Sequence, residues 1–451
     1  MIGRNQLSQM RITLILIALL FGLGSCSVQK QIAKSAKAAV LDNKALQAAH
    51  VGISIYDPTS KQYLYNYQGD KYFVPASNTK IPTCYAAMKY LGDSLVAARY
   101  HKVGNVLYIK AAGDPTFLHP EFSDQPLLTL LKESGQEIKI EIPATVEPLG
   151  NGWSWNDYDQ NYMAERSGFP LFGNMIWLSD KRLNEKQRSN ADSLIRFISG
   201  GPEYWVTPKY MVEKLYGDVE MNGRQRDKDR NQFYIKKFTG IKTIPFVTYH
   251  EITKKVLSGV LDKKIGDGYY SEKDFSSTII HSQPTDSLLK PMMHRSDNFF
   301  AEQSLLMVSN EKLGLMSDEK IIDTLLKTDL KDLPQKPRWA DGSGLSRYNL
   351  FTPQDFVTIL NKMKNEFGMD RLKVIFPTGG EGTISSYYRN MSGSIFGKTG
   401  TLSGVVAFSG YLYTKKGRLL IFSTLVNNHQ ASATDVRRAV EQFLTGIRER
   451  Y

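Results

Sequence analysis

The stretch Phe73-Val74-Pro75-Ala76-Ser77-Asn78-Thr79-Lys80 places a hydroxyl and an amine three residues apart at the start of an expected helix. On a helix, residues i and i+3 share one face, with Cβ atoms roughly 5–6 Å apart. Lys80 can activate Ser77 as a nucleophile only if burial or a second cation lowers the pKa of the lysine. The helix N-terminus adds N–H groups that favour a developing oxyanion. Taken alone, the pattern is more typical of a helix cap followed by a surface lysine.

Pro82 interrupts the expected helix. It follows Ser77 by five residues, which is beyond the first turn, where proline is tolerated. The sequence therefore predicts a kink, or a tight first turn before a main helix that ends at Gly92. Cys84 on this helix is expected to be a buried thiol without a catalytic role, because no positively charged surroundings are indicated for it.

The amino-acid composition is compatible with many kinds of globular protein. A chain of 451 residues with 41% hydrophobic and 23% charged residues is ordinary for a globular protein of more than one domain. The net charge of +12 fits attraction to nucleic acid or to an anionic envelope polymer, or simply a basic surface. The basic residues are dispersed and no recognition motif is present, so we expect no nucleic-acid partner. The seven histidines lack metal-ligand spacing, so neither a metal nor a cofactor is expected.

The N-terminus has the pattern of an export signal. Two arginines precede an apolar run at residues 12–23 that is short for a membrane span, so residues 1–25 are expected to be a signal peptide. The ending Leu23-Gly24-Ser25-Cys26 resembles a bacterial lipoprotein processing box, which implies cleavage before Cys26 and a lipid on its thiol. The alternative is an ordinary secretory signal in which Cys26 is incidental. The polar, alanine-rich residues 26–45 are expected to be a tether.

A second chemical pattern is Ser296-Asp297-Asn298. A hydroxyl and an amide two residues apart can both face a cleft from a loop between helices. Ser296 could relay a proton to a leaving amine, and Asn298 could hydrogen-bond a substrate amide. The same residues also fit a helix N-cap with Glu302 in the first turn.

A third pattern is Lys398-Thr399-Gly400-Thr401, which comes just before a predicted hairpin with strands at 405–413 and 419–426. Lysine and threonine at a strand can bind a carboxylate, and Gly400 lets a substrate backbone approach closely. The strand edge could also pair with an extended peptide. Alone, the pattern is more typical of a surface turn.

In this order, Ser-x-x-Lys, Ser-Asp-Asn and Lys-Thr-Gly resemble the motifs of the penicillin-recognising serine enzymes. More narrowly, residues 46–451 resemble the low-molecular-mass class C penicillin-binding proteins, the D-alanyl-D-alanine carboxypeptidase/endopeptidase family. Further stretches that support this resemblance are Gly113-Asp114-Pro115-Thr116, Gly152-Trp153-Ser154-Trp155-Asn156-Asp157 and Asp341-Gly342-Ser343-Gly344-Leu345-Ser346. One departure is Ala111-Ala112, which replaces the glycines usual before Gly-Asp-Pro-Thr and leaves the shape of that loop open.

The spacing between the first two motifs distinguishes this chain from the class A β-lactamases. Ser296 follows Ser77 by 219 residues, whereas class A β-lactamases have a far shorter gap without room for an inserted domain. Their Glu-x-x-Leu-Asn deacylation element is also missing between Glu302 and Trp339. Two alternatives nevertheless stay open, a β-lactamase and a non-catalytic envelope module that only binds stem peptides.

The resemblance implies a serine peptidase of the bacterial periplasm or cell envelope that acts on peptidoglycan stem peptides and binds β-lactams covalently. Lys80, kept neutral by burial and by Lys398, would deprotonate Ser77 for attack on the penultimate D-alanine. The backbone N–H groups of Ser77 and Thr401 would form the oxyanion hole.

The resemblance also implies roles for the other motif residues. Ser296 would pass a proton to the leaving D-alanine, and Asn298 would orient the acyl chain. The terminal carboxylate would be bound by the third motif, Lys398, Thr399, Gly400 and Thr401.

The expected fold is α/β (α+β), a transpeptidase-like domain of an antiparallel sheet flanked by helices. It would comprise residues 46–99 and 286–451, with a β-rich insertion at 100–285. Strands are predicted at 51–56, 62–67 and 106–110, and a helix at 252–261. A C-terminal helix has one apolar face that we expect to pack on the sheet, formed by Val436, Ala439, Val440, Phe443, Leu444 and Ile447.

Overall fold

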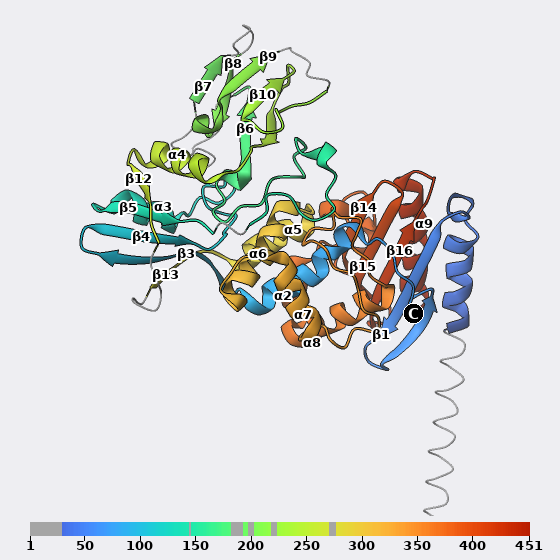
Figure 1. Cartoon of the computed structure of the whole chain (residues 1–451). Helices are drawn as coiled ribbons and strands as arrows, with labels where there is room; N and C mark the ends of the chain where they lie inside the picture. Colours follow the sequence, from blue (N-terminus) through green and yellow to red (C-terminus); the bar gives the residue numbers. More distant parts are fainter. Residues whose placement is uncertain (1–28, 144–145, 182–192, 197–202, 218–222, 270–276) are drawn as a thin grey trace, which may run out of the picture. The chain divides into compact units, whose positions relative to one another are not determined.

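The computed structural model describes residues 29–143, 146–181, 193–196, 203–217, 223–269 and 277–451 (Figure 1). The chain forms two compact units. Unit 1 comprises Met1–Asn78, Leu333–Pro337 and Leu350–Tyr451, and unit 2 comprises Thr79–Asp332 and Arg338–Asn349. Among the described residues, no helix is long and apolar enough to cross a bilayer.

Unit 1 is built on one antiparallel sheet with the strand order β14-β15-β16-β1-β2. The predicted strands and the hairpin are confirmed, and β14 additionally contains the third motif. The bounds are β1 (His50–Asp57), β2 (Gln62–Tyr67), β14 (Ile395–Leu402), β15 (Val405–Tyr413) and β16 (Leu419–Asn427).

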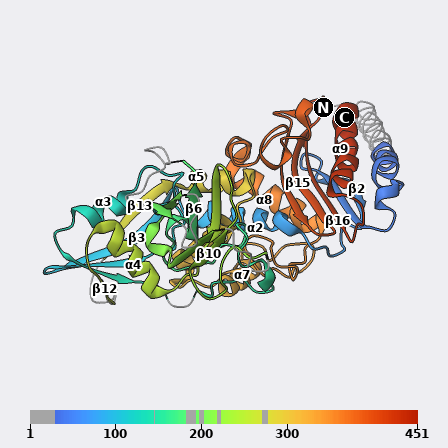
Figure 2. The same cartoon turned by 90° about the horizontal axis from the view of Figure 1, so that it is seen from above.

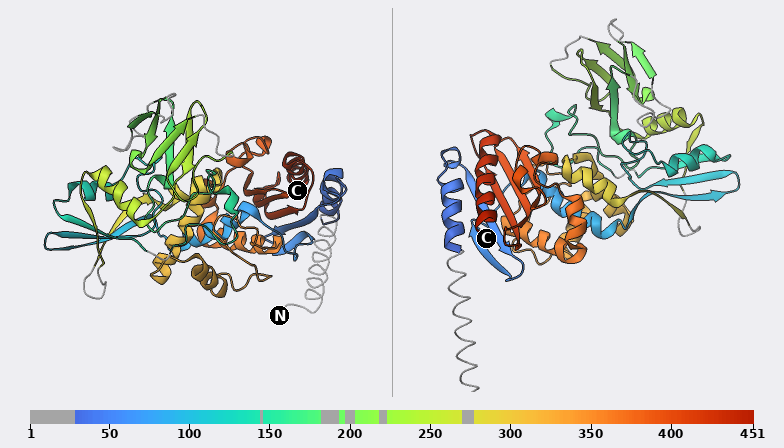
Figure 3. Two further views of the ribbon diagram at one scale, coloured as in Figure 1. Left: turned by 45° about the horizontal axis from the view of Figure 1, so that its top comes forward. Right: turned by 180° about the vertical axis from the view of Figure 1, so that it is seen from behind.

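Helices cover both faces of this sheet (Figures 2 and 3). Helix α9 (Ala433–Arg450) buries all six predicted apolar residues in a cluster shared with Val51, Ile53 and Ile55 of β1. Side chains alternate along a strand, so Gly52 points the other way. There a Cβ would meet Phe73 and Pro353, the first residue of α8 (Pro353–Ile375). The predicted packing of the C-terminal helix on the sheet is confirmed.

The predicted tether is wrong for its described part. Residues 29–36 are helical, and the short helices η1 (Lys37–Leu41) and η2 (Lys44–Leu46) follow. Ile32, Val40 and Leu46 are at most 2% exposed in the cluster that contains α9. Alanine is the best helix former, so an alanine-rich segment with apolar residues on one face folds onto the sheet. The predicted signal peptide and Cys26 lie outside the described residues.

The described residues of unit 2 form a group of helices and three sheets. The helices are α2 (Lys80–Tyr90), α3 (Pro126–Glu133), α4 (His250–Leu261), α5 (Thr285–His294), α6 (Asn298–Leu313) and α7 (Asp318–Lys327). The sheets have the strand orders β12-β5-β4-β3-β13, β11-β6-β8-β7 and β10-β9. The predicted helix at 252–261 and the predicted strand at 106–110 are confirmed.

The strands of unit 2 have the following bounds: β3 (Ser94–Val103), β4 (Val106–Ala111), β5 (Glu137–Glu141), β6 (Met175–Ser179), β7 (Ser193–Arg196), β8 (Glu203–Thr207), β9 (Lys214–Gly217), β10 (Gln232–Ile235), β11 (Ile241–Pro245), β12 (Ile265–Asp267) and β13 (Thr278–Pro284). One apolar cluster with members from Ala97 to Ile265 joins their sheets. Unit 2 therefore contains both the expected insertion and the helices around Lys80. The functional division at 99/100 and 285/286 stays a prediction.

Candidate active site

Ser77 lies in a tight turn before the main helix. The short helix η3 (Ala76–Thr79) precedes α2, which confirms the tight first turn predicted from Pro82. Ala76, directly before the serine, has a positive φ of 47°. The Asn78 amide donates to Ser409 Oγ of β15 at 2.7 Å, which ties this turn to the sheet of unit 1. Ser77 itself stays partly exposed.

Strand β14 passes very close to this turn. A Cβ added to Gly400 would lie 2.6 Å from Pro75 O and 2.9 Å from Ser77 N. Only glycine allows such an approach without displacing backbone, so the third motif is positioned against the turn that contains Ser77. Strand β14 is also an edge strand; besides β15, the described residues give it only an isolated bridge between Phe396 and Thr378.

The third motif presents polar groups along β14. Lys398 is fully buried, and its Nζ donates to the Thr399 carbonyl at 2.7 Å. Thr399 Oγ1 lies 2.7 Å from Thr383 Oγ1, and the exposed Thr401 accepts from Arg437 Nη2 at 2.6 Å. Arg437 of α9 was not predicted, because nothing in its helical pattern distinguishes it from a surface arginine.

Lys80 is the first residue of α2 and is fully buried in unit 2. Its Nζ donates to Asn298 Oδ1 at 2.6 Å and to the Ser343 carbonyl at 2.7 Å. The structure thus joins a residue of the first motif to one of the second, which are 218 residues apart.

Burial lowers the pKa of Lys80 to about 8, although the carboxylates of Asp341, Glu302 and Asp297 act in the opposite direction. Burial disfavours a charged amine, and nearby negative charge favours it. The prediction that burial lowers the pKa of this lysine is therefore confirmed. The expected contribution of Lys398 stays a prediction.

The second motif combines a cap with a presented amide. Asp297 caps α6 by accepting from Phe300 N at 2.9 Å, so the capping role is real. Ser296 has a φ of 65°, in the left-handed region, between α5 and α6. The Asn298 amide N donates to the Tyr162 carbonyl at 2.8 Å while its oxygen accepts from Lys80. Both partners of the amide fix its orientation.

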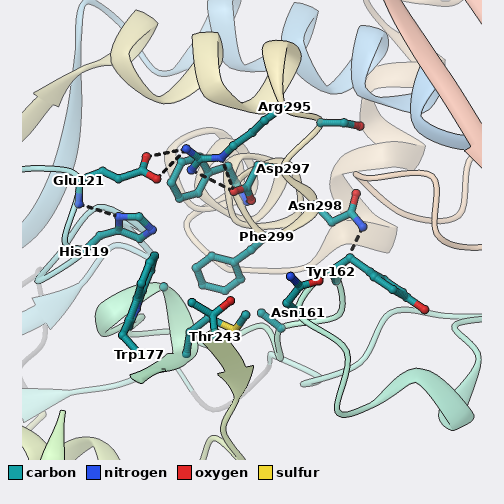
Figure 4. A pocket seen from close by; sticks show the side chains of 15 residues that line it. His119, Glu121, Asn161, Tyr162, Trp177, Thr243, Arg295, Asp297, Asn298 and Phe299 are labelled. Atoms are coloured by element: carbon teal, nitrogen blue, oxygen red, sulfur yellow. Dashed lines mark hydrogen bonds and ion pairs between the residues drawn. The ribbon is translucent and has the colours of Figure 1, made fainter. Parts of the chain in front are cut away.

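Ser296 and Asn298 line a cavity of about 320 Å³ within unit 2 (Figure 4). Its wall includes Arg295, which forms ion pairs with Glu121 and Asp297. His119 lies beside Trp177 and Phe300, and burial lowers its pKa to about 3, with Arg295 contributing. His119 is therefore neutral at any working pH. The sequence did not predict these wall residues, since they are scattered along the chain.

Two of the three supporting stretches, the one with Trp153 and the one that begins at Asp341, meet at the Asp341 carboxylate. This carboxylate accepts from Gly344 N at 2.8 Å and Ser346 N at 2.7 Å, and from Trp153 Nε1 at 3.0 Å. These bonds fix the backbone around Ser343, the residue whose carbonyl binds Lys80. The open question about the Gly-Asp-Pro-Thr loop also has an answer, since Asp114 Oδ1 accepts from Thr116 N at 2.9 Å in a turn.

Each unit therefore assembles one part of the predicted set. Unit 1 carries Ser77 and the third motif, and unit 2 carries Lys80 and the second motif, Ser296 and Asn298. The chain itself connects Ser77 to Lys80 over three residues. A serine hydroxyl, a buried amine, an oriented amide and a strand with polar side chains are groups that acyl transfer by a serine can use.

Comparison with known proteins gives a consistent result. The profile of the D-Ala-D-Ala carboxypeptidase 3 (S13) family matches residues 32–192 and 259–447. The D-alanyl-D-alanine carboxypeptidase DacB of Haemophilus influenzae is 23% identical over 86% of this chain and 88% of its own length. The D-alanyl-D-alanine carboxypeptidase of Actinomadura sp. (strain R39) is 25% identical over 88% of this chain and 81% of its own.

Solved structures agree on the fold. The crystal structure of penicillin binding protein 4 (dacB) from Haemophilus influenzae is similar with a TM-score of 0.67 and 19% identity, covering 91% of this chain and 97% of that one. Bd3459, a predatory peptidoglycan endopeptidase from Bdellovibrio bacteriovorus, is similar with a TM-score of 0.50 and 15% identity over 88% and 93%. These similarities confirm the predicted fold class of antiparallel sheets with flanking helices.

Proposed function

The chain belongs to the D-Ala-D-Ala carboxypeptidase 3 (S13) family, a family of peptidases, and we propose that it cleaves D-alanyl-D-alanine peptides of peptidoglycan through an acyl-enzyme on Ser77. Stem peptides would be its substrates and β-lactams its covalent inhibitors. The proteins to which it is similar include carboxypeptidases and an endopeptidase, so both terminal and crosslink bonds are candidate substrates.

In the proposed acylation step, neutral Lys80 removes the Ser77 hydroxyl proton as Oγ attacks the carbonyl carbon of the penultimate D-alanine. The tetrahedral oxyanion is stabilised by the N–H groups of Ser77 and Thr401; one such donor typically contributes ~10²–10³ in rate. The carbon–nitrogen bond then breaks as Ser296 delivers its proton to the departing amine. Ser296 is reprotonated by Lys80, which is thereby neutral again, and an ester to Ser77 remains.

In the proposed deacylation step, water gives up a proton to Lys80 as it attacks the ester. Lys80 passes this proton to Ser77 Oγ as the ester bond breaks, and the shortened peptide leaves. Asn298 orients the acyl chain in both steps. The leaving residue's carboxylate is bound by the third motif, Lys398, Thr399, Gly400 and Thr401.

One observation carries this proposal, the buried and hydrogen-bonded Lys80 three residues after Ser77. A lysine with a pKa of about 8 is substantially neutral at mildly alkaline pH, whereas a surface lysine is not. It can therefore act as a general base for an adjacent hydroxyl.

Muropeptide mass spectrometry tests the proposal. The chain from residue 27 onward and its Ser77→Ala variant are each incubated with pentapeptide monomers and crosslinked dimers. We expect the native chain, and not the variant, to release terminal D-alanine or to convert dimers to monomers. Only the native chain should gain the mass of one penicillin.

Two results would contradict the proposal. If the Ser77→Ala variant is still labelled by penicillin, the nucleophile lies elsewhere. If the native chain changes neither substrate, the chain is not a peptidase for these bonds, and penicillin turnover would then identify a β-lactamase.

We also propose that the protein is a lipoprotein of the bacterial periplasm, exported by residues 1–25 and anchored to a membrane through Cys26. The processing-box pattern supports this, and peptidoglycan lies outside the cytoplasm. The described part of the chain begins at Gln29, three residues after Cys26. The catalytic body would thus be held near the bilayer. Metabolic labelling with an alkyne fatty acid should tag the native protein; a Cys26→Ser variant tagged equally would contradict the anchor.

A further inference from the structure

Glu302 is a buried carboxylate in α6 that none of the three motifs includes. It is 1% exposed, and its Oε1 accepts from Ser343 N at 2.7 Å. The carbonyl of the same Ser343 accepts from Lys80 Nζ at 2.7 Å. One residue is thereby held at its N–H by the glutamate and at its carbonyl by the lysine.

Helix α6 supports Lys80 from two positions. Asn298 and Glu302 are four residues apart, so they lie on one face of the helix. Asn298 contacts the ammonium directly, and Glu302 reaches it through Ser343. The segment is packed tightly against the helix, since a Cβ on Gly342 would lie 2.8 Å from the Ala301 carbonyl.

We propose that Glu302 is a positioning residue for Lys80, which holds the lysine ammonium through Ser343 and places a carboxylate near it. The proposal rests on the proposed function, in which Lys80 is the general base. It adds a residue that would set the pH range of the reaction.

The charged groups around this site come from several elements. Arg166 lies 3.5 Å from Glu302 Oε2 and also pairs with Asp318 at the start of α7. Burial, Asp341 and Asp318 raise the pKa of Glu302, which reaches about 7, while Arg166 and the Ser343 N–H bond oppose the shift. Around Lys80, the facing carboxylates are Asp341, Glu302 and Asp297.

The sign of the effect follows from these charges. The ionised form of Glu302 favours the protonated form of Lys80 and so opposes the burial that lowers the lysine's pKa. Removing the negative charge should therefore lower the pKa of Lys80 further. The base would then become neutral at a lower pH, and acylation would begin at a lower pH.

The test is the pH dependence of penicillin acylation in the chain from residue 27 onward, followed by intact-protein mass. Glu302→Gln retains an oxygen that can accept from Ser343 N but has no charge. We expect the acid limb of the rate profile to move down by roughly 1 pH unit. The matched control is Glu311→Gln, the same substitution on the same helix where the glutamate pairs with Arg99, and its limb should not move.

Several results are decisive. If the rate of Glu302→Gln falls at every pH while the limb stays unmoved, the role is merely structural and the proposal is wrong. If circular dichroism shows that Glu302→Gln does not fold, Glu302→Asp replaces it, because aspartate keeps the charge but has a shorter side chain. We expect Glu302→Asp to acylate more slowly than the native chain, with the acid limb at the native pH. An unchanged acylation rate would contradict a positioning role. Failure of the native chain to acylate at all would instead overturn the proposed function.

Discussion

The two units hold their lysines in different ways. Both Lys80 and Lys398 are fully buried. Lys80 in unit 2 donates to two acceptors, the side-chain oxygen of Asn298 and the main-chain carbonyl of Ser343, and carboxylates influence its pKa. Lys398 in unit 1 donates to the neighbouring Thr399 carbonyl, on a strand whose notable feature is the close backbone approach at Gly400.

The difference indicates a division of labour. In unit 2 the arrangement governs a protonation state, because burial and charge set when an amine is neutral. In unit 1 the arrangement governs backbone geometry, because the proposed mechanism requires the N–H groups beside Ser77 to meet an oxyanion. Changes to the surroundings of Lys80 in unit 2 should therefore alter the pH profile, and changes to the backbone beside Ser77 in unit 1 should alter the rate without moving that profile.

The largest expected effect is the loss of the amine in Lys80→Met. Methionine has a similar length but cannot accept a proton, and general-base catalysis typically contributes about 10²–10⁴ in rate. We expect kcat/KM for a D-Ala-D-Ala peptide to fall by roughly that factor. The acid limb, expected near the lysine's pKa of about 8, should disappear. Steady-state kinetics between mildly acidic and alkaline pH measure both changes.

Lys89→Met is the matched control for this substitution, because Lys89 lies on the same helix and pairs with Asp329 on the partly exposed surface. It should retain the native rate and limb. If Lys80→Met kept the native acid limb, another group would be the base. The claim that unit 2 sets the protonation state of the base through Lys80 would then be wrong.

The next largest effect tests unit 1 through Gly400→Ala. The new Cβ would lie 2.6 Å from Pro75 O and 2.9 Å from Ser77 N, so β14 or the turn must move. A misplacement of about 1 Å can cost ~10² in rate. We expect kcat/KM to fall by about that factor at every pH, with the limb unmoved.

Gly135→Ala serves as its control, because a Cβ there meets nothing within 4 Å. A moved acid limb in Gly400→Ala would show that unit 1 also sets the protonation state. That result would argue against the proposed division between geometry and charge.

The sequence predicted the parts of the site that local patterns encode. The order of the motifs selected Ser77, Lys80, Asn298 and Lys398 as candidate site residues. The hairpin and the C-terminal helix followed from hydrophobic alternation and spacing. Local composition misled at residues 29–45, where alanine and polar residues indicated a tether. Their helix is stabilised by packing of Ile32 and Val40 on the sheet, which a segment's own composition does not reveal.

The supporting residues depend on contacts between distant parts of the chain. Glu302 bonds to a residue 41 positions away, and Arg166 pairs with Glu302 across 136 positions. Periodicity describes only which face of an element is buried, so a buried carboxylate in a helix such as α6 has no local signature. The pKa of Lys80 likewise depends on three carboxylates that only folding brings near it.

The smallest expected effect concerns Arg437, whose Nη2 donates to Thr401 Oγ1 at 2.6 Å beside the proposed carboxylate-binding strand. A partly exposed guanidinium contributes modestly to anion binding, so Arg437→Ala should raise KM for a pentapeptide by roughly 2–10-fold with little change in kcat. A peptide with an amidated C-terminus should not respond to the substitution. Arg438→Ala is the matched control, since Arg438 is the next residue of α9 and pairs with Glu441. If the two variants were equally impaired, or the amidated peptide were equally affected, Arg437 would stabilise α9 rather than bind the carboxylate, and substrate recognition in unit 1 would depend on β14 alone.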